Sequence, residues 1–342
     1  MDKRLQKYSQ TSDALHYMST CNLTKLILSN VIGQGYGVNS VIMINRTKIF
    51  IKAIPITKTD LNNMYDTSNI HNLPMYYNYG VGSAGFGCWR ELAFHIKASN
   101  FVINDLCPNF PILYHYRIVE NKQIAAKYKK YKFDKEFFEY WGSNKNIDIY
   151  LKARSETNYF IILCLEYFPT TMYSSNIIDK NTAWYINQIS TIITFLKKHE
   201  VIHFDAHLGN LITNGKILIL TDFGLVLDKS FRLTKPEIAF FNKNTNYDKA
   251  TLITNISRGI FNHVLKSDNT PKYEKKYNFD KNTENEKLNN IVFDNIDDIG
   301  KAFNDNYIQT LKKYRSIIIK YKAFIYKLRR DNTKSVVFPN EK

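Results

Sequence analysis

The stretch HFDAHLGN, at residues 203–210, and the stretch KILILTDFG, at residues 216–224, decide the fold of this chain. Between them lie the short apolar run LIT and Asn214-Gly215, a pair typical of a tight turn between two strands. Before them, residues 182–200 repeat apolar side chains at helical spacing and end in two lysines, which predicts an amphipathic helix. The pattern predicts a helix, a polar loop and a small hairpin, with carboxylate and amide side chains gathered around the loop.

These two stretches resemble the catalytic loop and the D-F-G motif of the protein kinase superfamily, which read H-R-D-x-x-x-x-N and D-F-G. The resemblance implies an ATP-dependent phosphotransferase in which Asp205 orients the acceptor hydroxyl and takes its proton. It also implies that Asn210 and Asp222 hold Mg²⁺, with Mn²⁺ as the alternative, against the phosphates of ATP. Oxygen ligands of this kind suit a hard cation. Asp and Asn are also common turn formers, so a purely local role is the competing interpretation.

A glycine-rich stretch, IGQGYG, lies upstream at residues 32–37. It resembles the loop that covers the ATP phosphates in kinases, where glycine lets backbone N–H groups approach the phosphates closely. The resemblance places Ile32, Gly33, Gly35 and Gly37 at the nucleotide. These glycines are one residue closer together than in the family's G-x-G-x-x-G, and a plain hairpin turn is the alternative.

Lys52 follows in IFIKAI, on an expected strand, where the family keeps the lysine that holds the α- and β-phosphates. Glu91 opens an expected helix at 88–102 and matches the carboxylate that pairs with this lysine. A lysine on a strand is often only solvated, and a glutamate in a first helical turn also compensates the helix dipole. Phe50 stands where the family has a small residue next to adenine, so we expect a narrowed or shifted nucleotide pocket.

The stretch LCLEYFP, at residues 163–169, resembles the strand and hinge that join the two lobes of a kinase. The resemblance places Leu165 at the back of the adenine pocket and Glu166 and Phe168 along the adenine edge. Ile212 would form the floor of that pocket. Apolar residues of this kind would lie in the core of almost any fold, so they corroborate the assignment without carrying it.

The resemblance implies an α+β, bilobal protein kinase-like fold. A small β-rich N-terminal lobe would span residues 1–168, and a larger helical C-terminal lobe would span residues 169–342. The hydrophobic pattern agrees, because strand-like runs dominate the first half of the chain and helical spacing dominates the second. Strands are expected at 26–33, in two runs within 41–57 about a turn at Asn45-Arg46-Thr47, at 112–119 and at 159–168.

Two insertions are expected, a polar and then glycine-rich one at 58–87 and one with a lysine cluster at 120–157. Beyond Pro236 the pattern predicts helices, including a long basic helix at 304–331. A polar stretch at 267–290 is expected to be a loop or locally disordered.

Three departures from the family pattern bear on the acceptor. Phe204 replaces the arginine of H-R-D, so we expect activity that does not depend on activation-loop phosphorylation. His207 stands near the transferred phosphate in place of the usual lysine. With Gly209 it gives D-A-H-L-G-N, which is similar to aminoglycoside and choline kinases and to haspin-like kinases. No clear A-P-E motif follows the D-F-G.

We therefore expect an atypical serine/threonine protein kinase, because the D-F-G and the glycine-rich stretch are present and the chain is basic. The alternative is a small-molecule phosphotransferase of the aminoglycoside or choline kinase kind. A second alternative is a pseudokinase that acts as a scaffold for acidic partners. The retention of the lysine, both aspartates and the asparagine of the family pattern argues against the scaffold.

The chain carries 47 Lys and Arg against 31 Asp and Glu, a formal net charge of +16. Such a balance favours a protein substrate that is acidic, a nucleic acid or another anionic surface. Lysine enrichment through AT-rich codons is the alternative explanation.

The cysteines lie far apart, so we expect a reducing compartment and neither a zinc site nor a disulfide framework. No signal peptide or membrane-spanning run is visible, which predicts a soluble, intracellular, cytoplasmic protein. The divergent domain and the codon bias resemble kinases of large DNA viruses, which would place it in the host cytoplasm or the virion.

Overall fold

A computed structural model describes residues 3–34, 36–128, 132–174 and 177–339 of the chain. The N-terminal part is built on a five-stranded sheet with the strand order β1-β2-β3-β5-β4, in which each neighbouring pair is antiparallel. The strands of this sheet are β1 (Val31–Gln34), β2 (Val38–Ile44), β3 (Thr47–Pro55), β4 (Leu113–Glu120) and β5 (Tyr159–Glu166). The helices of this part are α1 (Lys3–Tyr17), α2 (Thr20–Ser29), α3 (Lys58–Asn62), α4 (Cys88–Ile103), α5 (Lys122–Lys127), α6 (Lys135–Tyr140) and α7 (Lys145–Glu156).

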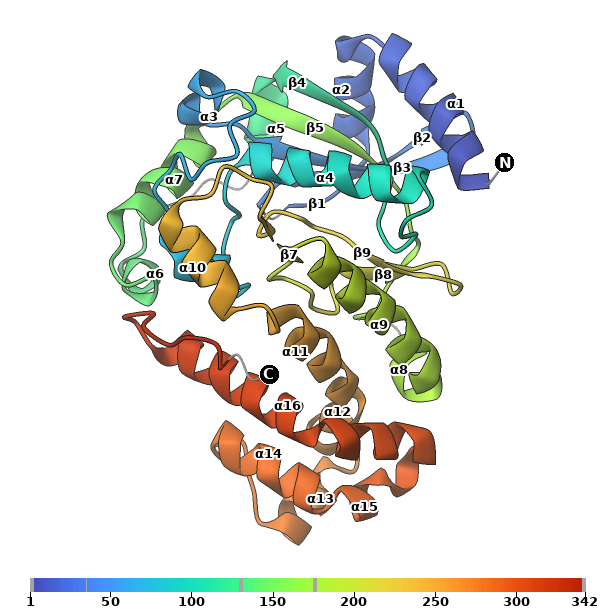
Figure 1. Ribbon diagram of the computed structural model, residues 1–342, viewed down its shortest axis with the longest axis vertical. Helices are drawn as coiled ribbons and strands as arrows, with labels where there is room; N and C mark the ends of the chain where they lie inside the picture. Colours follow the sequence, from blue (N-terminus) through green and yellow to red (C-terminus); the bar gives the residue numbers. More distant parts are fainter. Residues whose placement is uncertain (1–2, 35, 129–131, 175–176, 340–342) are drawn as a thin grey trace.

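The hairpin of β2 and β3 forms where the sequence predicts it. Asn45 and Arg46 both have positive φ, 46° and 65°, a conformation that suits the two-residue turn of a twisted hairpin. Burial alternates along β2, so one face of the hairpin joins the core. The predicted strands at 112–119 and 159–168 are confirmed as β4 and β5, and the predicted helix at 88–102 is confirmed as α4, which crosses the sheet (Figure 1).

The prediction of a strand over 26–33 is wrong for its first half. Residues up to Ser29 belong to α2, which is capped by Ser19 and buries Leu23 and Ile27. Leu23 and Ile27 are about one helical turn apart, so they lie on the same face of the helix. This helical spacing decides the local structure, although the segment also contains β-branched residues that favour a strand. The strand begins at Val31. Helix α2 packs beside β2, where the Ser40 hydroxyl donates to the Ile27 carbonyl at 3.0 Å.

The C-terminal part is mainly helical. Its short strands are β6 (Thr170–Thr171), β7 (Val201–Ile202), β8 (Leu211–Thr213), β9 (Leu218–Leu220) and β10 (Leu227–Asp228). Its helices are α8 (Ile177–Lys180), α9 (Thr182–Lys198), α10 (Lys235–Lys243), α11 (Tyr247–Thr254), α12 (Arg258–Leu265), α13 (Thr270–Tyr277), α14 (Asn285–Asp294), α15 (Ile296–Ile299) and α16 (Asp305–Arg330). In Figure 1 this part lies below the sheet, and α16 runs across its lower end.

Two helices and one hairpin of this part match their predictions. The amphipathic helix predicted at 182–200 is α9, and the long basic helix predicted at 304–331 is α16. Strands β8 and β9 pair antiparallel around the predicted turn, in which Gly215 has a φ of 85°. Only glycine takes this conformation without strain.

The prediction of a loop or local disorder over 267–290 is wrong, because α13 and the start of α14 form there. Helix α14 buries Leu288, Val292 and Phe293, and it lies beside α16 (Figure 1). Most of these apolar residues come after position 290, so the polar window shows no helical stripe. Packing against another helix, rather than local propensity, stabilises the segment.

The two expected insertions contain short helices. Residues 58–87 begin with α3, which is closed by a capping box between Thr57 and Asp60, and continue with little regular structure. Residues 120–157 contain α5, α6 and α7. Part of the predicted lysine cluster, residues 129–131, lies outside the described residues.

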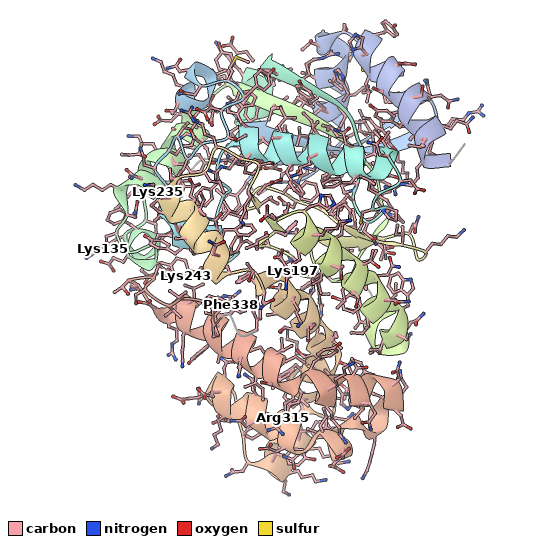
Figure 2. The ribbon with its side chains drawn as sticks, in the orientation of Figure 1. Lys135, Lys197, Lys235, Lys243, Arg315 and Phe338 are labelled. Atoms are coloured by element: carbon pink, nitrogen blue, oxygen red, sulfur yellow. The ribbon has the colours of Figure 1, made fainter. Side chains whose placement is uncertain are left out.

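The fold is thus a mixed α+β structure, with an antiparallel sheet in the N-terminal part and helices in the C-terminal part. Within the described ranges, no helix is both long and apolar enough to cross a membrane. The labelled basic side chains of Figure 2 come from α6, α9, α10 and α16, so the positive charge is spread over several helices. Of the cysteines, Cys21 is exposed, and Cys88, Cys107 and Cys164 are buried free thiols.

Candidate functional site

A largely buried lysine joins two carboxylates. The Nζ atom of Lys52 lies 2.7 Å from Oε1 of Glu91 and 2.7 Å from Oδ1 of Asp222. Lys52 stands on β3, opposite Leu163 of β5, and Glu91 stands in the first turn of α4. Three segments that are far apart in the sequence therefore meet at one ammonium group.

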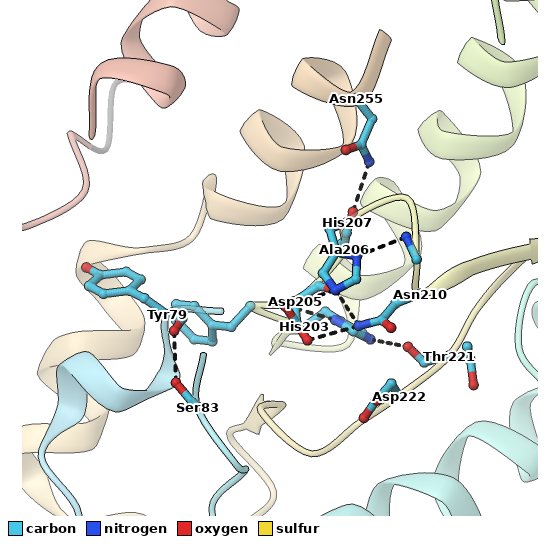
Figure 3. Close-up of polar contacts among 12 residues, drawn as sticks. Tyr79, Ser83, His203, Asp205, Ala206, His207, Asn210, Thr221, Asp222 and Asn255 are labelled. Atoms are coloured by element: carbon cyan, nitrogen blue, oxygen red, sulfur yellow. Dashed lines mark hydrogen bonds and ion pairs between the residues drawn. The ribbon is translucent and has the colours of Figure 1, made fainter. Parts of the chain in front are cut away.

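The loop of residues 203–210 places a second set of polar groups beside this lysine. The side-chain amide of Asn210 donates to both the backbone oxygen and Oδ2 of Asp205, each at 2.9 Å (Figure 3). His203 connects the loop to the residue after β9, because its Nε2 lies 3.1 Å from the Thr221 carbonyl and its Nδ1 accepts from the Asp205 N–H. These bonds hold Asp205 and Asp222 on facing segments of chain.

Asp248 of α11 fixes the backbone of this loop through two hydrogen bonds. Its two carboxylate oxygens accept the N–H groups of His203, at 2.6 Å, and Phe204, at 3.0 Å. Burial raises the pKa of Asp248 to about 7, while the two N–H groups oppose that shift. A buried carboxylate with two backbone donors is a rigid support for the loop.

Two residues of the site hold an unusual backbone conformation. Phe204 has a φ of 63° and Asp222 has a φ of 66°, in the left-handed region that side chains other than glycine rarely adopt. Phe204 is compensated by packing, since its ring lies 5.4 Å from that of Phe240 and 5.1 Å from that of Tyr247. Other residues of the chain, such as Asn45 and Glu200, also have positive φ, so the conformation fixes the backbone at these two places without identifying a function by itself.

The electrostatics separate the two aspartates. Burial and the neighbouring Asp222 carboxylate raise the pKa of Asp205 to about 8. Burial opposes ionisation of Asp222 as well, but Lys52 outweighs it and holds the pKa of Asp222 at about 2. Burial also raises the pKa of Glu91, against the pull of Lys52. Asp222 is therefore a permanent anion, whereas Asp205 is poised to exchange a proton near neutral pH.

His207 lies beside Asp205, with Nε2 3.7 Å from Oδ1 of that carboxylate. Its other ring nitrogen, Nδ1, accepts the Gly209 N–H at 2.9 Å. A neutral imidazole that accepts at Nδ1 carries its proton on Nε2. His207 therefore presents an N–H donor at the open side of Asp205.

Two adjoining cavities meet at the lysine. The first, which we call the apolar cavity, has a volume of about 370 Å³. It is lined by the residues that we expect around the adenine, namely Ile32, Phe50, Leu165, Glu166, Phe168 and Ile212. The second, of about 280 Å³, is the polar cavity; it is lined by Asp205, His207, Glu91, Arg154, Tyr36 and residues of the segment 80–85. Lys52, Asn210 and Asp222 line both cavities.

Apart from Gly33 and Gly37, every residue predicted for the site and described by the structure lines one or both of these cavities. Lys52, Glu91, Asp205, Asn210 and Asp222 meet at their junction. A Cβ on Gly33, within β1, would meet no described atom within 4 Å, whereas a Cβ on Gly37 would lie 2.8 Å from the Ala53 carbonyl. Gly35 lies outside the described residues, so the predicted phosphate loop is described only in part.

Glu166 has fixed partners at the rim of the apolar cavity. Its backbone N–H donates to the Ile112 carbonyl at 2.8 Å, and its carboxylate accepts from Arg4 at 2.6 Å. The remaining backbone along the predicted adenine edge belongs to Tyr167 and Phe168, which also line the apolar cavity.

Sequence reasoning missed several residues of the site. Asp248, Arg154 and His95 carry no local motif, and only the folded chain brings them to the cavities or the loop. The segment GVGSAG, residues 80–85, did carry a signal in its glycine density. A Cβ on Gly80 would lie 2.2 Å from Oδ1 of Asp205, and one on Gly85 would lie 2.9 Å from the Gly224 carbonyl. The glycines allow this segment to pack directly against the loop of residues 203–210 and against the D-F-G stretch.

The donor set fits a magnesium ion held together with phosphates. Across the described residues, no group of three or more His, Cys, Asp and Glu side chains could hold a metal ion by itself. Mg²⁺ usually takes only one or two carboxylates from the protein and completes its shell with water and substrate phosphates. Asp222 is anionic and Asn210 uses its amide nitrogen toward Asp205, which leaves its oxygen for a cation.

Comparisons with known proteins add no relative. No protein-family model matches the chain, and a search of curated proteins finds no significant match.

Proposed function

We propose that this chain is an ATP-dependent phosphotransferase with a bilobal, protein kinase-like fold. The observation that carries the proposal is the position of the Lys52 ammonium, 2.7 Å from both Glu91 and Asp222, at the junction of an apolar and a polar cavity. Phosphoryl transfer depends mainly on positioning and on charge neutralisation, and these side chains supply both.

In this proposal the apolar cavity holds the adenine. Ile32, Phe50 and Leu165 offer apolar surface there, and the backbone of Tyr167 and Phe168 offers polar groups at its edge. Lys52 then reaches the α- and β-phosphates at the point where the two cavities join. Glu91 fixes the lysine from α4, so that its charge points into the cleft.

Asn210 and Asp222 would hold Mg²⁺, which neutralises charge on the phosphates when it is bound. The acceptor hydroxyl lies in the polar cavity and gives its proton to Asp205 as its oxygen bonds to the γ-phosphorus and the bond to the β-phosphate breaks. The raised pKa of Asp205, about 8, suits a group that must accept a proton in that step. His207 points its Nε2 proton toward the same place and can donate to an oxygen of the transferred phosphate.

We place the acceptor hydroxyl on a serine or threonine of a protein, as in an atypical protein kinase. The basic surface favours such a macromolecular and acidic substrate. The second candidate is a small-molecule phosphotransferase. It is favoured by the short connection from Gly224 to α10, which leaves little chain for a peptide-docking segment. Cytoplasmic localisation is part of the proposal, since a magnesium nucleotide is the implied cofactor.

The test is transfer of labelled γ-phosphate by the purified protein, with Mg²⁺, onto a panel of proteins, peptides, amino sugars and small alcohols. Asp205→Asn and Asp222→Ala should each abolish transfer while the melting temperature stays close to that of wild type. Asp268→Asn, at an exposed position away from the cavities, is the matched control and should keep full activity. Equal turnover in wild type and Asp205→Asn would overturn the roles, and ATP binding without transfer would favour the scaffold.

A further inference from the structure

A buried arginine forms the far wall of the polar cavity. Arg154 of α7 is 2% exposed, and it lines this cavity but not the apolar one. Its Nη1 donates to the Tyr150 hydroxyl at 3.1 Å and its Nη2 donates to the Tyr36 carbonyl at 2.6 Å. Among the described residues, the buried Nε has no hydrogen-bond partner. One donor of the guanidinium is therefore unused by the part of the protein that the structure describes.

Arg154 also has no acidic partner. Among the described residues, no carboxylate lies within ion-pair distance of its guanidinium, whereas the other fully buried arginine, Arg90, meets Glu237 at 2.5 Å. Burial alone would lower the pKa of Arg154, but its interactions with Tyr150, Tyr128 and the more distant Asp60 carboxylate raise that pKa above its ordinary value. The group is thus a buried permanent cation, and such a charge is costly unless an anion compensates it.

The position of Arg154 separates it from the nucleotide. The phosphates of ATP belong at Lys52, which both cavities share, and the base belongs in the apolar cavity. Arg154 lies in the compartment that also holds Asp205 and His207, where the acceptor would enter. A planar guanidinium suits a carboxylate or a phosphate through paired hydrogen bonds.

The walls around Arg154 leave room for such a group. The segment 80–85 contributes Gly80, Gly82 and Gly85 to the lining, and a Cβ on Gly82 would meet no atom within 4 Å. The Tyr36 hydroxyl donates to the Gly82 carbonyl and so joins the glycine-rich stretch to this segment. This part of the lining is therefore backbone and a tyrosine, and the carboxylates that line the same cavity, Glu91, Asp205 and Asp222, belong to the site around Lys52.

We propose that Arg154 binds an anionic group carried by the acceptor next to its hydroxyl, so that the substrates are acidic or already phosphorylated peptides. This inference rests on the proposed phosphotransferase function. It names the substrate class that the polar cavity accepts. A glutamate or aspartate side chain and a phosphoserine present the same chemistry to the guanidinium, and peptides can tell them apart.

The test compares three peptides that share one acceptor serine and differ at the neighbouring positions, which are glutamate, phosphoserine or glutamine. Wild type should show a kcat/KM at least tenfold higher for a charged peptide than for the glutamine peptide. A preference for phosphoserine alone identifies phosphate as the anion, and equal preference identifies a site for either anion. Equal kcat/KM for all three peptides would overturn the inference.

Arg154→Met should remove the preference, lowering kcat/KM for the charged peptides tenfold or more and leaving the glutamine peptide within twofold. Arg315→Met, on the exposed face of α16, is the matched control and should keep the preference (Figure 2). Retention of the preference in a folded Arg154→Met protein would overturn the inference. If that variant does not fold, Arg154→Lys is tested in its place. The comparison of the three peptides with the wild-type protein still decides whether the inference holds.

Failure of the inference differs from failure of the function. A wild type that phosphorylates peptides without regard to charge, or that phosphorylates only small alcohols, refutes the substrate class and leaves the phosphotransferase intact. A wild type that transfers phosphate to no acceptor refutes the function. Calorimetric binding of an acidic peptide that is lost in Arg154→Met would then still support the anion site, and its absence would refute that too.

Discussion

Gly80→Ala is the sharpest test of the geometry around Asp205. The added Cβ would lie 2.2 Å from Oδ1 and 3.0 Å from Cγ of Asp205, and 3.1 Å from the Phe204 carbonyl. Ordinary contacts of carbon are about 3.5 Å, so the carboxylate or the segment must move by about 1 Å. Gly80 does not have a positive φ, so the substitution acts through this contact and not through backbone strain.

A shift of this size at a catalytic group costs roughly 100-fold in rate, which is about 2.7 kcal/mol of transition-state stabilisation. We expect kcat for phosphoryl transfer to fall by about that factor, with little change in the KM for ATP, because Lys52 and the apolar cavity are untouched. Steady-state kinetics with labelled ATP would measure both constants. Thermal melting would show whether the fold is retained.

The matched control is Gly300→Ala, in a short 3-10 turn between Gly300 and Ala302. Its Cβ would lie 2.6 Å from Cδ1 of Ile308, a comparable clash at the start of α16 and outside both cavities. It should lower the melting temperature and leave kcat within about twofold of wild type. A Gly80→Ala protein with wild-type kcat would refute the placement of Asp205 as the proton acceptor.

Three further substitutions test the supports of the site. Lys52→Met leaves the buried Glu91 without its partner, so the free energy of unfolding measured by chemical denaturation should fall by about 3–5 kcal/mol. The KM for ATP should rise tenfold or more. An unchanged KM would indicate that another lysine binds the phosphates. Asp248→Ala leaves two buried backbone N–H groups unpaired, so the free energy of unfolding should fall by roughly 2–4 kcal/mol and kcat should fall as well. A denaturation midpoint equal to that of wild type would contradict the supporting role of Asp248. Burial lowers the pKa of His95 to about 3, so the unfolded chain takes up its proton first as the pH falls below about 6.5, and about 2 kcal/mol of stability should be lost between pH 7 and pH 5. His95→Leu should remove that loss, and identical pH profiles of unfolding for both proteins would refute it.

The sequence predicts the elements that carry local patterns. Alternating burial in β2 and β3, a left-handed Asn45-Arg46 turn and the helical stripe of α9 are each readable within a few residues, and each is confirmed. Residues 270–290 were harder, because α13 and α14 are polar over most of their length and depend on packing against distant helices. Local propensity says little about such segments.

The same distinction applies to the site. Lys52, Asp205, Asn210 and Asp222 lie in short stretches whose spacing is informative, and the structure brings them together. Arg154 lies in an insertion with no motif, and only the fold shows that no carboxylate of the described residues pairs with it. A single sequence without the fold does not indicate which of its arginines is buried without a counter-ion.

Phe204 has a consequence for how such an enzyme would be controlled. Its ring packs against the rings of Tyr79, Phe240 and Tyr247. These aromatic contacts anchor the loop that bears Asp205 in the interior. An arginine at this place would offer a docking point for a phosphate added elsewhere on the chain, and a phenyl ring offers none. For the proposed phosphotransferase, the position of the Asp205 loop would therefore not depend on a phosphate bound at residue 204.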